Sequence, residues 1–98
     1  MALNQQDKRR LRSLGHGLKP VVIVGGAGVT DAVVRELDGA LAHHELLKVR
    51  VNAGSRPERG RMIATLCERT DAALVQSIGH VALLYRANPD KPRISLND

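Results

Sequence analysis

The sequence predicts one compact domain over residues 1–98, of the α/β (α+β) class, with a four-stranded mixed sheet. Two observations predict parallel strands: an apolar β-branched run and an alternating run are each followed by a helical pattern, and strands separated by helices imply a right-handed crossover. A third observation predicts antiparallel pairing, because two strand-like segments flank the two-residue loop Gly79-His80. The expected order is helix, strand, helix, strand, helix, strand, strand, and the length suits one domain.

The first helix is expected from about Asn4 to Leu14. Asn4 can cap it, with Asp7 three residues later, and Gly15 is a natural residue just past a helix end. Because the leucines form only a narrow apolar edge, we expect this helix on the surface of the domain, with its basic side chains partly solvated.

Pro20 to Val24 is expected to form a central strand that is covered on both faces, because the run is continuous and β-branched. The glycine-rich turn Gly25-Gly26-Ala27-Gly28 follows it. The next helix should run from about Thr30 to His44, with Thr30 as its cap and Asp31 in its first turn.

Leu47 to Val51 alternates, so its apolar residues should face the core while Lys48 and Arg50 face outward. A third helix should follow, since Ser55 and Glu58 have the spacing of a capping box. Its exposed start carries Arg56, Arg59 and Arg61.

The last two strands are expected over about Ala72 to Ile78 and Val81 to Arg86. Gly79 comes first in the loop between them, which is the preference of a type II′ turn. The tail, residues 87–98, is rich in turn-forming residues, and we expect it to be loosely held.

Composition limits the cellular setting. Cys67 is the one cysteine, so no intramolecular disulfide can form. Charged residues stand where a signal peptide would need its apolar segment, and no apolar run approaches membrane-spanning length. We therefore expect a cytoplasmic protein without membrane contact. We also expect a monomer.

The net charge of +5 is unevenly placed. Before Thr30, five basic residues face one acidic residue, for a local charge of +4; the basic residues are Lys8, Arg9, Arg10, Arg12 and Lys19. Such an excess is typical of nucleic-acid-binding proteins, although a surface that only promotes solubility would look the same. Because Tyr85 is the one aromatic residue among Phe, Trp and Tyr, any RNA contact should depend on backbone and charge rather than base stacking.

The glycine turn between a strand and a helix is suited to a phosphate, because free amides and the positive end of the helix dipole meet there. No lysine follows Gly28, so a nucleotide-hydrolysing phosphate loop is not expected. Asp31 occupies the position where a dinucleotide-binding loop needs Gly or Ala. The G-x-x-G spacing of Gly25 and Gly28 instead matches the loop with which KH-type domains hold a nucleic-acid backbone, and a turn without a ligand is the alternative.

No catalytic or metal-binding set is apparent. The adjacent His43 and His44 point to different helix faces, and neither His16 nor His80 has ligands at a suitable spacing. Cys67 lies on an apolar stripe and is expected to be a buried structural thiol. We therefore expect neither an enzyme nor a cofactor.

Several segments, in order across nearly the whole chain, make the sequence resemble the bacterial YhbY-type proteins, the stand-alone form of the CRM (chloroplast RNA splicing and ribosome maturation) domain. They are Leu11-Arg12-Ser13-Leu14-Gly15-His16, Leu18-Lys19-Pro20-Val21-Val22-Ile23-Val24-Gly25, Gly28-Val29-Thr30, His43-His44-Glu45-Leu46-Leu47-Lys48-Val49, Ile78-Gly79-His80-Val81 and Leu84-Tyr85-Arg86. The resemblance implies a fold similar to the C-terminal domain of translation initiation factor three, with an additional N-terminal helix. It also implies RNA binding and association with precursors of the large ribosomal subunit, in a role in ribosome assembly.

The expected RNA-binding residues are the loop and the basic residues around it. Amides from Gly26 to Val29 should receive a phosphate, and the first-helix basic residues should lie near the loop and surround it with positive charge. The full set is Gly25, Gly26, Ala27, Gly28, Val29, Lys8, Arg9, Arg12, Lys19, Lys48 and Arg50. Members of the family often carry a basic or polar residue between the glycines and a lysine in the hairpin, where this chain has Gly26-Ala27 and His80.

Three other functions stay open at this point. A compact basic α/β domain could instead coat duplex DNA as a chromatin-like protein. A phosphate-ligand-binding enzyme could use the glycine loop, although the chain lacks a loop lysine and an acid–base pair. The chain could also be a protein-interaction module whose basic charge is incidental.

Overall fold

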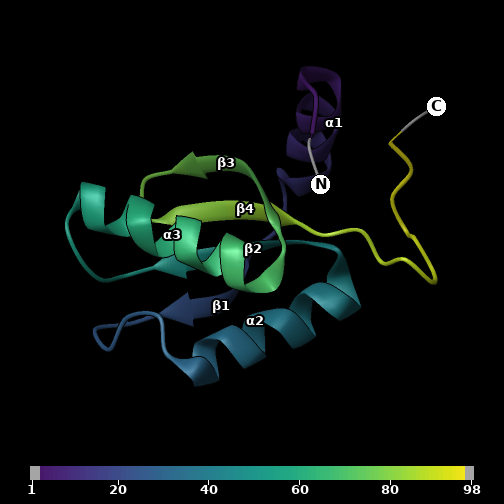
Figure 1. The fold of residues 1–98 in the computed structure, drawn as a ribbon. Coiled ribbons are helices and arrows are strands. Elements are labelled where there is room, and N and C mark those ends of the chain that lie inside the picture. The colour runs from purple at the N-terminus through teal and green to yellow at the C-terminus, as the bar shows by residue number, and fades with distance from the viewer. Residues whose placement is uncertain (1–2, 97–98) are drawn as a thin grey trace.

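The computed structural model describes residues 3–96, which form three helices and four strands. The elements are α1 (Gln5–Gly15), β1 (Pro20–Val24), α2 (Asp31–His44), β2 (Leu46–Val51), α3 (Arg56–Thr70), β3 (Ala73–Ile78) and β4 (Val81–Tyr85). This order and the mixed sheet confirm the predicted fold class (Figure 1). No helix within residues 3–96 has the length and apolar character needed to cross a bilayer.

The sheet has the strand order β1-β2-β4-β3, with β1 parallel to β2 and both remaining pairs antiparallel. The prediction that Pro20–Val24 is a central strand covered on both faces is therefore wrong: β1 is an edge strand. Val22 and Val24 are buried, but 47% of Val21 and 58% of Ile23 are exposed. The continuous apolar run is misleading because α2 packs on one face of β1, while Val21 and Ile23 on the other face stay exposed.

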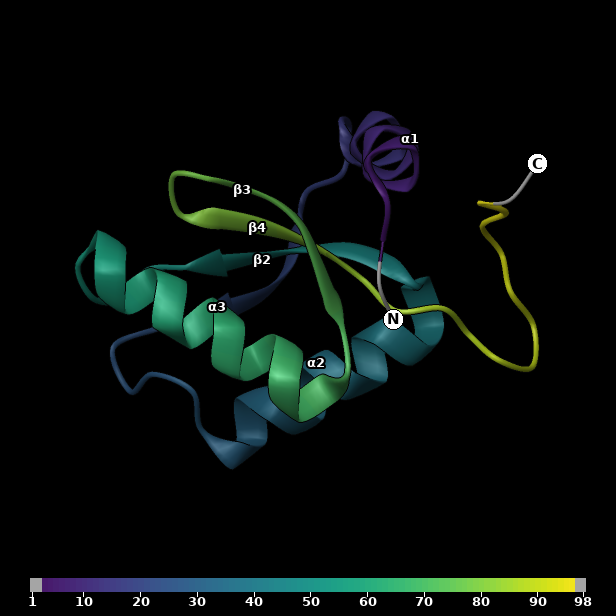
Figure 2. The same ribbon diagram turned by 45° about the horizontal axis from the view of Figure 1, so that its top comes forward.

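The two faces of the sheet carry different layers. Figure 2 shows α2 and α3 on one side and α1 on the other. The larger core lies under α2 and α3, where Leu37, Leu41 and Leu66 pack on the inward-facing residues of β1, β2 and β4. In β2 the predicted alternation is confirmed, since Leu47, Val49 and Val51 are buried in this core.

A smaller core lies beneath α1, at the end of the sheet where β2 begins and β4 ends. Its buried members are Leu11, Leu46, Val75, Leu83 and Tyr85. Gly15 is the last residue of α1 and His16 is the cap, so the helix ends one residue later than expected. A Cβ at Gly15 would lie 2.7 Å from the Leu83 Cδ1 atom. Glycine is therefore needed here because Leu83 packs so closely, and not because the chain turns at the end of the helix.

Local sequence features position the other element boundaries. Asn4 and Asp7 form a capping box on α1, the Thr30 hydroxyl accepts from the Val33 amide, and the Ser55 hydroxyl accepts from the Glu58 amide. Gly79 has φ +58° in the hairpin loop, which agrees with the glycine-first turn expected there.

The C-terminal tail is bound by one buried carboxylate. Glu45, between α2 and β2, is fully buried, and its carboxylate accepts from the amides of Asn88 (2.6 Å), Arg93 (2.7 Å) and Ile94 (3.0 Å). Ile94 and Leu96 also pack against the smaller core. These contacts argue against the expectation that residues 87–98 are loosely held; the last two of those residues lie outside the described part of the chain.

Candidate nucleic-acid interface

The glycine loop starts where β1 ends and leads into α2. The Gly28 amide donates to the Gly25 carbonyl at 3.0 Å, which closes a four-residue turn, and Gly28 has φ +75°. Only glycine adopts that backbone conformation without strain. A Cβ at Gly25 or Gly26 would meet no atom within 4 Å, so the outer side of the turn is open. The geometry lets another backbone approach this turn closely.

Two backbone amides of the turn are free to bind a ligand. Within residues 3–96, neither Gly26 nor Ala27 donates its amide to a protein acceptor. The Gly28 amide is used inside the turn, so the expectation that amides from Gly26 to Val29 all receive a phosphate is wrong at this position. The side chain of Thr30 likewise occupies the Val33 amide at 3.1 Å.

The negative charge of the acidic residue beside the loop is balanced by arginines. Asp31 Oδ1 accepts from Arg69 Nη2 at 2.8 Å, and this hydrogen bond and the arginine charge lower the pKa of Asp31. A second cation, Arg35, lowers the Asp31 pKa further. The start of α2 therefore carries a carboxylate that is compensated by arginines, so it repels an anion less than an unpaired aspartate would.

Arginines from α3 share the end of the sheet with the glycine loop. Because β1 and β2 are parallel, their carboxyl ends meet, and the Asn52 amide donates to the Val24 carbonyl at 2.8 Å. The segment after β2 leads directly into α3, where Arg56 and Arg61 are exposed. The hairpin lies at the same end, with His80 Nδ1 3.0 Å from the Val51 carbonyl oxygen. We call this group the loop-end patch: Gly25–Gly28, Arg50, Arg56, Arg61 and His80.

The structure does not bring the predicted α1 residues to the loop. Lys8, Arg9 and Arg12 belong to α1, which packs over Leu46 and Tyr85 at the opposite end of the sheet (Figure 1). Lys19 precedes β1, whose five residues at about 3.3 Å each place it about 16 Å from the turn. The Debye length is about 8 Å at physiological salt, so charge on α1 is largely screened at the loop. The expectation that the first-helix residues surround the loop is wrong.

Lys48 and Arg50 point to the outer face of the sheet as predicted. Arg50 is exposed, and its Nε donates to Asn52 Oδ1 at 2.8 Å, so it lies near the loop. Lys48 is half-buried farther from the loop, and its Nζ lies 3.5 Å from the His16 carbonyl oxygen. These two residues therefore belong to different parts of that face.

The α3 arginines were absent from the predicted site, although the sequence contained the information needed to place them. Two parallel strands joined by a helix end at the same edge, so the residues after Val24 and after Val51 had to be neighbours. The prediction instead grouped residues by their proximity in sequence to the most basic segment.

No group of three or more His, Cys, Asp or Glu residues in the described chain could hold a metal ion. Cys67 is half-buried, and burial raises the pKa of its thiol, which disfavours the reactive thiolate at neutral pH. The site thus consists of backbone amides and positive charge.

Comparison with known proteins points in one direction. The family model of the CRS1 / YhbY (CRM) domain matches residues 3–86. A probable RNA-binding protein of Pseudomonas aeruginosa is 46% identical over 98 residues, covering 100% of this chain and 93% of the relative. An RNA-binding protein of Haemophilus influenzae is 42% identical over 88 residues, covering 90% of this chain and 89% of the relative.

A solved structure resembles the whole fold. The solution structure of a hypothetical protein from Staphylococcus aureus, for which RNA binding is proposed, superposes with a TM-score of 0.84 at 33% identity. The match covers 97% of this chain and 99% of the other. These matches confirm the family resemblance and the fold that the sequence predicted.

Proposed function

Because this chain belongs to the CRS1 / YhbY (CRM) domain family, we propose that it is a non-enzymatic RNA-binding protein of the cytoplasm that acts as a monomer. Its relatives from Pseudomonas aeruginosa and Haemophilus influenzae are named for RNA binding. We assign it to precursors of the large ribosomal subunit, where it assists assembly. Its ligand is ribosomal RNA, and it uses no cofactor.

The open glycine turn is the observation that carries this proposal. The free amides of Gly26 and Ala27 receive a phosphate of the RNA backbone, with the N-terminus of α2 behind them. The turn brings no charge of its own, so the attraction comes from Arg50, Arg56 and Arg61 in the loop-end patch. Gly28 keeps the turn in shape rather than binding the phosphate through its amide.

The basic residues of α1 contact a different stretch of RNA. Arg9 is exposed and Lys8 and Arg12 are half-buried on α1, and Lys19 is exposed beyond it. These residues are too far from the turn to act on the same phosphate, so they lengthen the RNA footprint along the molecule. This division suits a structured RNA that spans both ends of the sheet.

The first test separates RNA contact from folding. Gly26→Ala adds a methyl group on the open side of the turn, where no protein atom lies within 4 Å. Its backbone lies outside the left-handed region, so stability should be unchanged or rise by about 0.4 to 1 kcal/mol. We expect binding to a large-subunit ribosomal RNA fragment to weaken, because the methyl group blocks close approach.

The matched control is Gly39→Ala, an equally open glycine in α2. It should leave RNA affinity unchanged. If Gly26→Ala binds as tightly as the wild type in a filter-binding assay, the turn is structural and does not bind RNA.

The second test addresses charge and the type of nucleic acid. Affinity should fall with salt by about one log unit per log of salt for each phosphate neutralised. A salt-independent affinity would contradict phosphate binding.

Competition with duplex DNA distinguishes RNA binding from a chromatin-like role. Tighter binding to duplex DNA than to RNA would support the chromatin-like role. Sedimentation of the cellular protein with large-subunit particles at low salt tests the assembly role.

A further inference from the structure

The outer face of the sheet carries an exposed apolar surface that RNA binding does not explain. Ile78 is 68% exposed, Ile23 58%, Val21 47% and Leu18 39%. They come from both edge strands and from the segment between α1 and β1. α1 covers the end of this face over Leu46, Val75, Leu83 and Tyr85, and the rest of the face stays open. We call this uncovered part, with the pocket described next, the open face.

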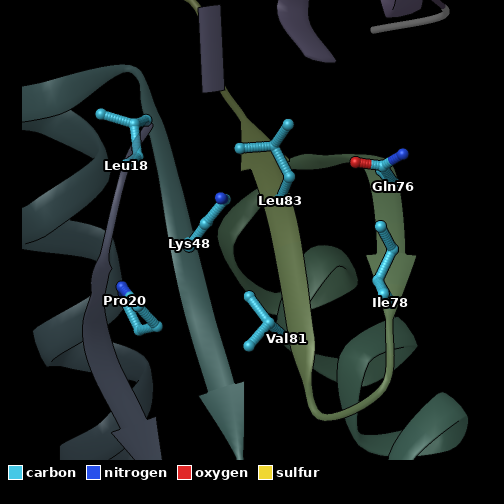
Figure 3. Close-up of a pocket in the computed structure, with 7 residues that line it drawn as sticks. All are labelled: Leu18, Pro20, Lys48, Gln76, Ile78, Val81 and Leu83. Carbon is cyan, nitrogen blue, oxygen red and sulfur yellow. The ribbon is translucent and has the colours of Figure 1, made fainter. Parts of the chain in front are cut away.

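A pocket lies in the open face between the two edges of the sheet. Figure 3 shows Lys48 near its centre, with Leu18 and Pro20 on one side and Leu83 and Val81 on the other. Its volume is about 280 Å³, which accommodates one or two aliphatic side chains. Mostly apolar walls with one ammonium group and the Gln76 amide suit an amphipathic occupant.

The edge strand β1 adds unpaired backbone groups beside this pocket. The Val24 carbonyl accepts from the Asn52 amide, so it points toward the β2 side. In a parallel pair the backbone groups of alternate residues point to the same side, so those of Ile23 point away from β2. An extended segment can therefore add to β1 by main-chain hydrogen bonds, with side chains on one of its faces beside Val21 and Ile23.

The charge of the open face is entirely positive. Lys48 and Arg50 are its ionisable residues, and neither forms an ion pair with a carboxylate within residues 3–96. Lys48 is held instead among apolar side chains, with a carbonyl oxygen 3.5 Å from its Nζ. A carboxylate from outside the chain would give this ammonium group a charged partner.

We propose that the open face is a docking surface for an extended segment of another protein that combines aliphatic and acidic side chains. Its aliphatic residues fill the pocket between Leu18 and Leu83 and cover Ile23 and Ile78, and a carboxylate of the segment pairs with Lys48, the charged residue of the pocket. This interaction is separate from phosphate binding by the glycine turn, so it recruits the domain to a protein partner while the turn holds RNA.

The observations favour a protein segment over two other occupants. RNA offers no aliphatic surface to cover Ile23 and Ile78, and the open face presents no aromatic ring on which a base could stack. A second copy of the chain would bring Lys48 and Arg50 against the same charges, and each copy carries a net charge of +5. A protein segment with aliphatic and acidic side chains supplies the apolar surface that RNA lacks and the negative charge that a second copy lacks.

The experiment selects random displayed peptides on the immobilised full-length chain and then measures the affinity of the enriched peptides. We expect enriched peptides to combine aliphatic and acidic residues. Ile23→Ser together with Ile78→Ser should weaken their binding about tenfold or more, because these residues are the most exposed apolar contacts. Thermal unfolding should show that this variant still folds, since both side chains are largely solvent-exposed. Leu74→Ser is the matched control: it removes a 41% exposed leucine that pairs in register with Leu84, on the other face.

A charge exchange tests the role of Lys48. Lys48→Glu should weaken the acidic peptides, and replacing their acidic residues by lysine should restore binding to this variant. The proposal is overturned if no peptide is enriched, if the enriched peptides lack acidic residues, or if all variants bind them equally. It is also overturned if the chain dimerises through Ile23 and Ile78.

RNA affinity of the Ile23→Ser, Ile78→Ser variant keeps the two proposals distinguishable. We expect it to bind ribosomal RNA as the wild type does. If it loses RNA binding and peptide binding together, the open face belongs to the RNA interface and the docking proposal fails. If the wild type binds peptides but no RNA, the proposed RNA function fails and the docking surface stands.

Discussion

Replacing Glu45 tests whether one buried carboxylate holds the C-terminal tail. Its side chain is fully buried and accepts three hydrogen bonds from tail amides, the shortest at 2.6 Å from Asn88. Glu45→Ala removes all three, whereas Glu45→Gln keeps one acceptor oxygen and loses the charge. Glu45 has φ +62°, and both variants keep a residue with a Cβ there, so this strain does not favour one variant over the other.

The expected loss can be worked out from these contacts. A hydrogen bond to a charged group contributes about 1.5 to 3 kcal/mol, so three would contribute more than about 4 kcal/mol if the tail stayed in place. The tail can leave, however, and its amides then bond to water while each released residue regains about 1 kcal/mol of backbone entropy. We therefore expect Glu45→Ala to lower the free energy of unfolding by about 2 kcal/mol and Glu45→Gln by about half as much.

Urea denaturation measures the loss, and amide hydrogen exchange locates it. In Glu45→Ala the amides of Arg93 and Ile94 should exchange about thirtyfold faster, while those of β4 should change only with global stability. Glu36→Ala, which removes an exposed glutamate of α2, is the control and should change neither quantity. If Arg93 and Ile94 already exchange in the wild type as fast as in a free peptide, the tail is not held and the reasoning is refuted.

Three further predictions concern the surroundings of the loop. Gly28→Ala should cost about 1 to 2 kcal/mol in thermal unfolding, because φ +75° is strained for any residue with a Cβ, and no loss would show that the turn relaxes. Arg69→Ala should raise the pKa of Asp31 toward the ordinary range of aspartate in an NMR titration. In the wild type this pKa is lowered, so the ion pair stabilises the fold above the unfolded-state pKa of Asp31, and that contribution disappears as pH falls through the folded-state value. Cys67 should react with a thiol reagent at pH 8 more slowly than in the urea-unfolded chain, because burial raises the pKa of its thiol; equal rates would contradict this.

The elements of the fold could be predicted from local sequence, because caps and periodicity act within a few residues. Asn4, Thr30 and Ser55 begin the helices, and the alternation of Leu47–Val51 assigns each side chain to a face. The position of β1 at the sheet edge could not be predicted in this way. Burial of an apolar run depends on which layers cover it, and that is decided by segments distant in sequence.

The geometry around the glycine turn could be predicted only in part, for the same reason. The glycine turn is a local feature, and its conformation at Gly28 agrees with the sequence interpretation. Which charges surround the turn depends on tertiary structure. The number of basic residues near the N-terminus pointed to α1, whereas the fold places the start of α3 beside the turn. The role of Glu45 had no local indication, because its partners lie more than forty residues away.

Both described ends of the chain pack against the smaller core. Leu3 and Leu96 both pack against it, and Arg10 Nε donates to the Ser95 carbonyl at 2.9 Å. Neighbouring chain ends permit circular permutation. A short glycine–serine linker could therefore join residues 3 and 96, with the chain reopened at Gly17, an exposed glycine whose Cβ position is empty. Such a permutant would begin near β1 and end with α1, and it would leave the glycine turn unaltered while reversing the order in which α1 and the sheet emerge during synthesis.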